Sequence, residues 1–88
     1  MSGLRRNPAV TTTEIEGEFF LVEPASGEIF YLDAVTSGIW RLVEQPCDEA
    51  EILSTLAAAF PETAAERLRG DVGRLLAEMR QARLLLPA

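Results

Sequence analysis

The first third of the chain has the residue pattern of β-strands. Residues 10–14 are rich in β-branched side chains, and residues 18–23 and 28–33 are apolar and aromatic runs of strand length. Between the last two runs lie Pro24 and Gly27, placed as a four-residue hairpin loop requires. The pattern predicts a three-stranded meander with residues 18–23 in the middle and residues 28–33 at an edge of the sheet.

From residue 33 onward the apolar positions follow helical spacing. Asp33 can cap a first helix that ends before Pro46. The apolar residues recur at i, i+4, i+7 and i+8, namely Val35, Ile39, Leu42 and Val43. Trp40 on the same helix is expected in the core, as an anchor for helix packing.

Two capping-box patterns predict the next two helices. Asp48 with Glu51 opens a second helix that Pro61 ends, and Thr63 with Glu66 repeats the pattern for a third helix. The expected apolar faces are Ile52, Leu53, Leu56, Ala57 and Phe60 on the second helix, and Leu68, Val72, Leu75, Leu76 and Met79 on the third. Three strands followed by three helices predict an α+β fold rather than alternating β-α units.

The third predicted strand carries apolar side chains on both faces. Phe30 and Leu32 point to one side, while Ile29 and Tyr31 point to the other. An edge strand presents unpaired N–H and C=O groups, so two apolar faces favour a strand that is completed by a partner. The alternative is that the third helix covers the second face.

The third predicted helix has two unlike flanks beside an apolar stripe centred near Met79. One flank combines an apolar residue with arginines and no acid: Leu76, Arg69, Arg80 and Arg83. On the other flank opposite charges can pair: Arg67, Asp71, Arg74 and Glu78. A groove between the edge strand and the first flank would add an extended peptide as a further strand and favour acidic side chains. The alternative is a solvated helix surface with ordinary ion pairs.

Composition excludes most classes of catalytic site. With 88 residues the chain has room for one domain with a small core. It contains no His and no Lys, and Cys47 is its only cysteine. Ser-His and Cys-His nucleophiles, Schiff-base lysines, His-based zinc sites and an internal disulfide are therefore excluded. We expect no metal and no cofactor.

The charge is negative overall and unevenly distributed. The net charge of −6 argues against non-specific nucleic-acid binding. Residues 14–51 hold ten acids and one base, whereas residues 67–83 hold five arginines and two acids. This asymmetry predicts a local electropositive face on an acidic body.

Carboxylates and one thiol are the remaining candidates for acid–base or nucleophilic catalysis. Glu49 with Glu51, or Glu16 with Glu18, could act as acid and base in a cleft. The first pair also suits the first turn of a helix, and the second pair suits a turn around a glycine. Cys47 precedes a helix N-terminus, which would lower its pKa, but without a base partner it is more simply a small passive residue. We therefore assign no catalytic residue and expect a protein that is not an enzyme.

The N-terminus does not have the features of a targeting segment. No apolar run follows Arg5 and Arg6, which excludes a signal peptide. No stretch approaches the ~18 apolar residues of a membrane span. We expect a cytoplasmic protein with no membrane partner, a flexible N-terminus over residues 1–8 and one domain over residues 9–86.

A longer motif joins the third strand to the first helix. Residues 27–40 read Gly-Glu-Ile-Phe-Tyr-Leu-Asp-Ala-Val-Thr-Ser-Gly-Ile-Trp, and further matching pairs and triplets follow at residues 51–53, 71–72, 75–76 and 84–85. This order resembles the PqqD-like family, named after coenzyme PQQ synthesis protein D, in which a short apolar strand ends in Leu-Asn before a helix with an Ile-Trp or similar pair. The likeness covers roughly residues 14–86.

The resemblance implies a RiPP recognition element, where RiPP denotes a ribosomally synthesised and post-translationally modified peptide. Such a domain is winged-helix-like, with a three-stranded antiparallel sheet followed by three helices. It binds the leader segment of a precursor peptide antiparallel to the third strand, in the cleft against the third helix, and presents it to modifying enzymes. The implied peptide-binding residues are Glu28, Ile29, Phe30, Tyr31, Leu32 and Asp33 on the strand, and Arg69, Val72, Leu75, Leu76, Met79, Arg80 and Arg83 on or just after the helix.

The implied partners are a precursor leader peptide and an enzyme such as a radical-SAM enzyme or a leader peptidase, with the adaptor itself a monomer or weak dimer. Three positions depart from the family pattern: Asp33 replaces an Asn, residues 45–47 replace a Gly-containing turn, and Arg83 replaces a Gly. These departures leave PQQ, lasso peptides and other products open.

A winged-helix DNA-binding regulator is the alternative function. It would require a basic recognition helix. The second predicted helix carries Asp48, Glu49 and Glu51 with no base, and the third reaches only a small positive charge. We therefore expect no nucleic-acid partner.

Overall fold

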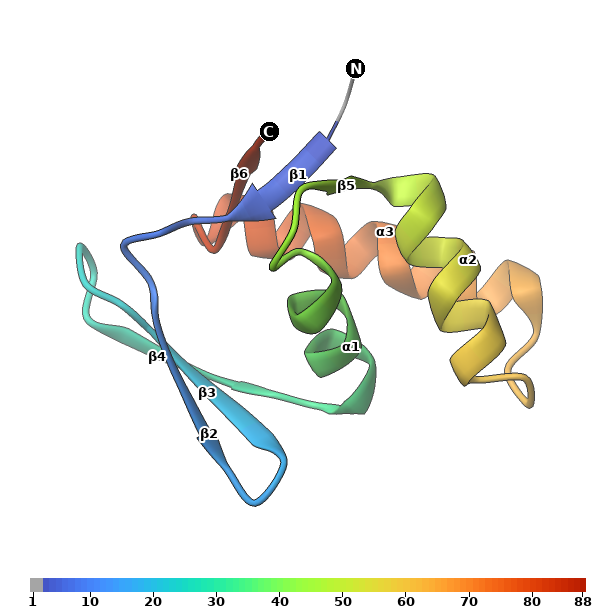
Figure 1. Ribbon diagram of the computed structural model, residues 1–88, viewed down its shortest axis with the longest axis horizontal. Coiled ribbons are helices and arrows are strands. Elements are labelled where there is room, and N and C mark those ends of the chain that lie inside the picture. The colour runs from blue at the N-terminus through green and yellow to red at the C-terminus, as the bar shows by residue number, and fades with distance from the viewer. Residues whose placement is uncertain (1–2) are drawn as a thin grey trace.

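The computed structural model describes residues 3–88 and contains two separate antiparallel sheets (Figure 1). The larger sheet is the predicted meander, with the strand order β2-β3-β4. Its strands are β2 (Thr11–Ile15), β3 (Glu18–Glu23) and β4 (Glu28–Leu32). This sheet extends away from the helices at the lower left of Figure 1, and β4 is one of its edges.

Three helices follow β4, as the sequence predicted. They are α1 (Ala34–Leu42), α2 (Glu49–Ala59) and α3 (Ala65–Gln81), and α2 packs against both of the others. The α+β class, with a three-stranded antiparallel sheet and three helices, is thereby confirmed. None of the helices within residues 3–88 is both long enough and apolar enough to cross a membrane.

Both hairpins of the larger sheet end in turns that the local sequence explains. Glu16 and Gly17 have φ values of 53° and 82°, which is the two-residue turn whose twist matches that of the flanking strands. In the next turn the buried Glu23 carboxylate accepts hydrogen bonds from the backbone N–H groups of Ala25 (2.8 Å) and Ser26 (3.2 Å). These bonds fix the start of β4 relative to β3.

Two of the three predicted helix caps form. Oδ1 of Asp33 accepts a hydrogen bond from the Thr36 N–H at 2.9 Å, which places the first turn of α1 directly after β4. Asp48 and Glu51 form the complete capping box of α2, with bonds of 2.8 and 3.2 Å. Both caps satisfy N–H groups that have no partner inside the helix.

The start of α3 differs from the prediction. Its N-cap is Ala64, and no side chain there bonds the first-turn amides. Thr63 lies one residue before the cap, so its hydroxyl is displaced from the position that a capping box requires. The predicted pairing of Thr63 with Glu66 is therefore wrong.

The second sheet was absent from the sequence prediction. It joins the first and last strands of the described chain in the order β5-β1-β6, and Figure 1 shows β1 and β6 side by side. Its strands are β1 (Gly3–Arg6), β5 (Cys47–Asp48) and β6 (Leu85–Pro87). Strands of two to four residues are too short to show a periodic pattern, which explains the omission.

The N-terminal segment is consequently part of the fold. Leu4 is buried, and the Arg6 guanidinium donates two hydrogen bonds to the Trp40 carbonyl oxygen, at 2.9 and 2.7 Å. The same guanidinium lies 4.6 Å above the Trp40 ring. The expected flexible N-terminus over residues 1–8 is therefore wrong for residues 3–6, while Met1 and Ser2 lie outside the described residues.

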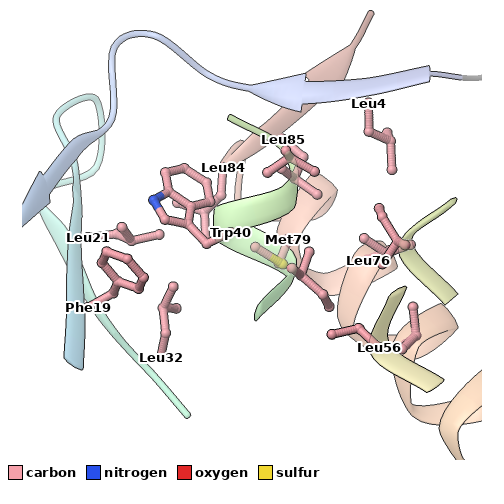
Figure 2. Close-up of a cluster of buried hydrophobic side chains, with 14 of the residues drawn as sticks. Leu4, Phe19, Leu21, Leu32, Trp40, Leu56, Leu76, Met79, Leu84 and Leu85 are labelled. Atoms are coloured by element: carbon pink, nitrogen blue, oxygen red, sulfur yellow. The ribbon is translucent and has the colours of Figure 1, made fainter. Parts of the chain in front are cut away.

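Trp40 occupies the centre of the hydrophobic core (Figure 2). The side chain is fully buried, and its indole Nε1 donates a hydrogen bond to the Thr12 hydroxyl at 3.1 Å. Phe19, Leu21 and Leu32 of the larger sheet belong to the same cluster. The expectation that Trp40 is a core anchor is confirmed.

The C-terminus of α3 adopts a turn that normally contains glycine. The Leu84 N–H bonds the Met79 carbonyl at 2.9 Å, and the Arg83 N–H bonds the Arg80 carbonyl at 3.0 Å. This pair of bonds defines a Schellman motif, with Arg83 in the left-handed position at φ 63°. The helix therefore ends with the geometry that glycine would give, although the residue is an arginine.

We predict that Arg6→Ala lowers the free energy of unfolding by about 1.5–3 kcal/mol, because a charged donor to a partly buried carbonyl is lost. Urea denaturation monitored by tryptophan fluorescence measures the change. The matched control is Arg5→Ala on the same strand, whose exposed side chain should change stability by less than about 0.5 kcal/mol. Equal effects would show that Arg6 does not fasten β1 to the core.

A second prediction concerns the left-handed residue. Arg83→Gly should raise the free energy of unfolding by about 1 kcal/mol, because glycine adopts a positive φ without the steric cost that a Cβ imposes. The same substitution one turn earlier, Arg80→Gly, should lower it by about 1 kcal/mol, because it places glycine inside a helix. Thermal melts of the two variants should therefore shift in opposite directions, and shifts of the same sign would contradict the assigned turn.

Candidate functional site

The open side of β4 is a backbone edge that lies beside a pocket. Within residues 3–88, β4 pairs with β3 on one side and with no strand on the other. Phe30 and Leu32 face inward, whereas Ile29 is 71% exposed and Tyr31 59% exposed. The predicted faces are confirmed, and the alternative in which α3 covers the outer face is wrong.

A pocket of about 380 Å³ lies between β4 and the C-terminal half of α3. Its walls are mostly apolar, and they come from four separate parts of the chain. The lining residues are Phe30, Tyr31 and Leu32 on β4, Asp33 just after it, Thr36 on α1, Leu75, Glu78 and Met79 on α3, Ala82 at its C-cap, and Leu84 beyond it. We call this pocket, with the open side of β4, the β4–α3 groove.

The groove brings together part of the predicted peptide-binding set. Phe30, Tyr31, Leu32, Asp33, Leu75 and Met79 all line it. Glu28 and Ile29 lie on the same strand but outside the lining. The predicted residues that the structure places away from the lining are Arg69, Val72, Leu76, Arg80 and Arg83.

The reason for the difference is the rotation of α3 about its axis. Leu76, expected at the groove, is only 1% exposed and belongs to the core, and Figure 2 shows it on the Leu56 side of the buried cluster. Its neighbour Leu75 is half-buried and lines the groove instead. Consecutive helical residues point about 100° apart, so the groove faces the flank of Glu78 rather than that of Arg80.

Glu78, Ala82, Thr36 and Leu84 are lining residues that the sequence analysis did not assign. For two of them a signal was present, because Glu78 and Ala82 lie three and seven positions after Leu75 and so share its helix face. Thr36 and Leu84 reach the groove only through the packing of α1 and of the segment after α3.

The charges around the groove are the reverse of those expected. Arg74 lies 3.2 Å from Glu78 and 3.9 Å from Asp71, and Arg67 lies 3.8 Å from Asp71, so the expected pairing on this flank is confirmed. Among the described residues that line the groove there is no arginine. The expected electropositive groove is therefore wrong, because the lining includes two acidic residues, Asp33 and Glu78.

The pKa of the Tyr31 phenol responds to the negative charge at the end of β4. Hydrogen bonding to the Glu18 carboxylate raises the pKa of the Tyr31 phenol, and desolvation and the charges of Glu18 and Asp33 raise it further. This direction indicates a negative potential where β4 ends and α1 begins.

A second, larger pocket of about 600 Å³ shares Tyr31, Leu32 and Asp33 with the groove but opens toward α1 and α2. Its lining includes a close contact between the two helices, because a Cβ on Gly38 would lie 2.9 Å from Leu56 Cδ2. The end of β4 is thus flanked by a pocket on each side.

The thiol of Cys47 and the candidate carboxylates contribute to local structure rather than to a catalytic site. Burial raises the pKa of the Cys47 thiol, and the charges of Glu51 and Asp48 raise it further, so the helix N-terminus does not activate it. Its sulfur donates to the Leu42 carbonyl at 3.6 Å. Glu51 belongs to the capping box and Glu16 to the tight turn of the first hairpin.

Comparison with known proteins identifies relatives with this architecture. The family model for coenzyme PQQ synthesis protein D (PqqD) matches residues 18–85. No curated protein sequence matches the chain.

Two solved structures share the fold. TbiB1 in complex with the TbiA(β) leader peptide is 28% identical, with a TM-score of 0.82, over 92% of this chain and 93% of that chain. A lasso peptide synthetase B1 complexed with its leader peptide is 19% identical, with a TM-score of 0.76, over 96% of this chain and 98% of that chain. The second likeness concerns the fold alone.

The rotation of α3 generates a prediction about two adjacent leucines. Leu76→Ala should lower the free energy of unfolding by about 2–5 kcal/mol, because it opens a cavity in the core. Leu75→Ala should cost clearly less, because its side chain is only half-buried and lines an open groove. Chemical denaturation measures both, and a larger loss for Leu75→Ala would contradict this orientation of the helix.

Proposed function

This chain belongs to the coenzyme PQQ synthesis protein D (PqqD) family, and we propose that it is a non-catalytic adaptor for a ribosomally made precursor peptide. It binds the leader segment of the precursor by strand addition to β4 and presents the peptide to a modifying enzyme. The observation that carries the proposal is the unpaired side of β4 beside an apolar groove. The 28% identity to TbiB1, a protein solved with a leader peptide, supports it.

Strand addition follows from the backbone chemistry of an edge strand. The N–H and C=O groups on the open side of β4 are donors and acceptors for an extended peptide, and such main-chain bonds supply affinity without regard to sequence. Alternate side chains of the added strand would face the groove. Its apolar walls would therefore select apolar leader residues spaced two apart.

We propose that the residues in contact with the leader peptide are those that line the β4–α3 groove or belong to β4, and not the arginines of α3. On the strand this set comprises residues 28–33, and on α3 it comprises Leu75, Glu78, Met79 and Ala82. Val72 and Leu76 hold α3 in place from the core side. Arg69, Arg80 and Arg83 receive no contact role, because they lie outside the lining.

An adaptor role agrees with the inventory of side chains. A chain without His or Lys has few groups for acid–base or nucleophilic chemistry, so the modification is assigned to a partner enzyme such as a leader peptidase or a radical-SAM enzyme. The DNA-binding alternative gains no support from the charges, because Arg67 and Arg74 pair with acids on their own helix.

The outer face of the larger sheet supports presentation to a partner protein. Ile15, Ile29 and Tyr31 are the exposed large hydrophobic residues among those described, and the strand register places all three on this face. Phe20 lies beside Tyr31, with ring centroids 5.2 Å apart. The same register places Glu18 on this face and Glu14, Glu23 and Glu28 on the opposite one, so the face suits a partner surface with an apolar centre and a basic residue opposite Glu18.

We predict that leader binding protects the backbone of β4. When a leader peptide that binds the protein is added, the amides of residues 29–32 that do not bond β3 should exchange hydrogen more slowly, because they gain acceptors. Hydrogen exchange followed by NMR measures this. Protection confined to β2, the opposite edge of the sheet, would contradict strand addition at β4.

The groove side chains provide the matching affinity test. Leu75→Ala should weaken leader binding by about 1–2 kcal/mol, because it removes part of an apolar wall. Leu53→Ala is the control, since Leu53 is also a half-buried leucine but lies on α2 outside both pockets at the end of β4. Equal losses of affinity would place the binding site elsewhere.

A further inference from the structure

We infer that the groove prefers leader segments with a basic side chain beside the C-terminal end of β4, and that Asp33 and Glu78 determine this preference. The inference rests on the proposed function, because strand addition brings the leader to this position. The open strand and the apolar pocket provide the binding site. The two carboxylates decide which charge it accepts.

Asp33 and Glu78 face the groove from two elements. Asp33 follows the last residue of β4, and its carboxylate is held in place by the bond from the Thr36 N–H at 2.9 Å. Glu78 lines the opposite wall on α3. A leader strand beside Leu32 would therefore run between two carboxylates.

Nearby arginines neutralise this charge only in part. Arg74 is 3.2 Å from Glu78 but also 3.9 Å from Asp71, so one cation is shared between two acids. Arg41, at the margin of the second pocket, is paired with Glu14 at 3.2 Å. Glu18 adds a further negative charge next to Tyr31.

The excess of negative charge at the end of β4 favours a basic side chain on the added strand. A Lys or Arg on the added strand has the length to bring its cation to either carboxylate while its aliphatic stem packs on the apolar wall. A Glu or Asp at the same position would meet like charges. Because such pairs are solvent-exposed, we expect each to change affinity by about two- to fivefold.

The test uses a phage-displayed library of random peptides selected on the immobilised protein. Selected peptides should combine apolar residues two apart with an adjacent Lys or Arg, at a higher frequency than the unselected library. A synthetic copy of one selected peptide is then titrated against variants by fluorescence anisotropy. Asp33→Asn, which preserves the helix cap, and Glu78→Gln should each weaken binding by about two- to fivefold.

The control variant is Glu62→Gln, which removes the same charge from the loop between α2 and α3 and should leave the affinity unchanged. Binders that depend on Leu75 but are acidic or uncharged would overturn this inference and leave the proposed function standing. Equal weakening by all three variants would show a general charge effect and overturn it as well. A selection without any binder that depends on Leu75 would contradict the proposed function, and the inference with it.

Discussion

The indole of Trp40 contacts parts of the chain that are distant in sequence. The indole N–H donates a hydrogen bond to the Thr12 hydroxyl on β2, and the indole ring lies under the Arg6 guanidinium from β1. The backbone carbonyl of Trp40 accepts two hydrogen bonds from the same guanidinium. The next residue, Arg41, lies over the Phe19 ring and pairs with Glu14. One turn of α1 therefore sets the position of the larger sheet against the helices.

The groove depends on that position. β4 leads directly into α1 through the Asp33 cap, so the orientation of α1 also fixes where β4 runs. α3 packs behind through Met79 and Leu76, which leaves Leu75 facing the strand across a pocket of about 380 Å³. A small protein can hold such a groove open because most of its lining residues belong to β4, α1 and α3 rather than to loops.

Within residues 3–88 no strand pairs with the outer edge of β4, which leaves a template for pairing. Natural sheets usually protect such an edge with charges, bulges or a covering segment. Here the surrounding acids, among them Glu18, Glu28 and Asp33, give the edge a negative charge that disfavours pairing with a second copy of itself. Under the proposed function the same acids would favour a peptide of the opposite sign, so protection against self-association and selection of a ligand would have one physical basis.

Local sequence determined the features that local forces control. The strands from residue 11 to residue 32, the hairpin turn at Gly27, the Asp33 cap and the Asp48–Glu51 capping box each depend on a few neighbouring residues. The alternation of Phe30 and Leu32 with Ile29 and Tyr31 likewise follows from the period of a strand. This alternation gives β4 two apolar faces, and the order of the three strands along the chain predicts that β4 lies at an edge of the sheet.

Tertiary structure decided what depends on contacts between distant segments. An apolar stripe on α3 has two flanks that the sequence cannot distinguish, because either could face the strand until the helix packs. Packing placed Leu76 in the core and Leu75 with Glu78 at the groove, which reversed the expected charge of the site. The short strands β1, β5 and β6 pair segments that are distant in sequence, and so their pairing, like the hydrogen bonds from Arg6 to the Trp40 carbonyl, could not be seen in any local pattern.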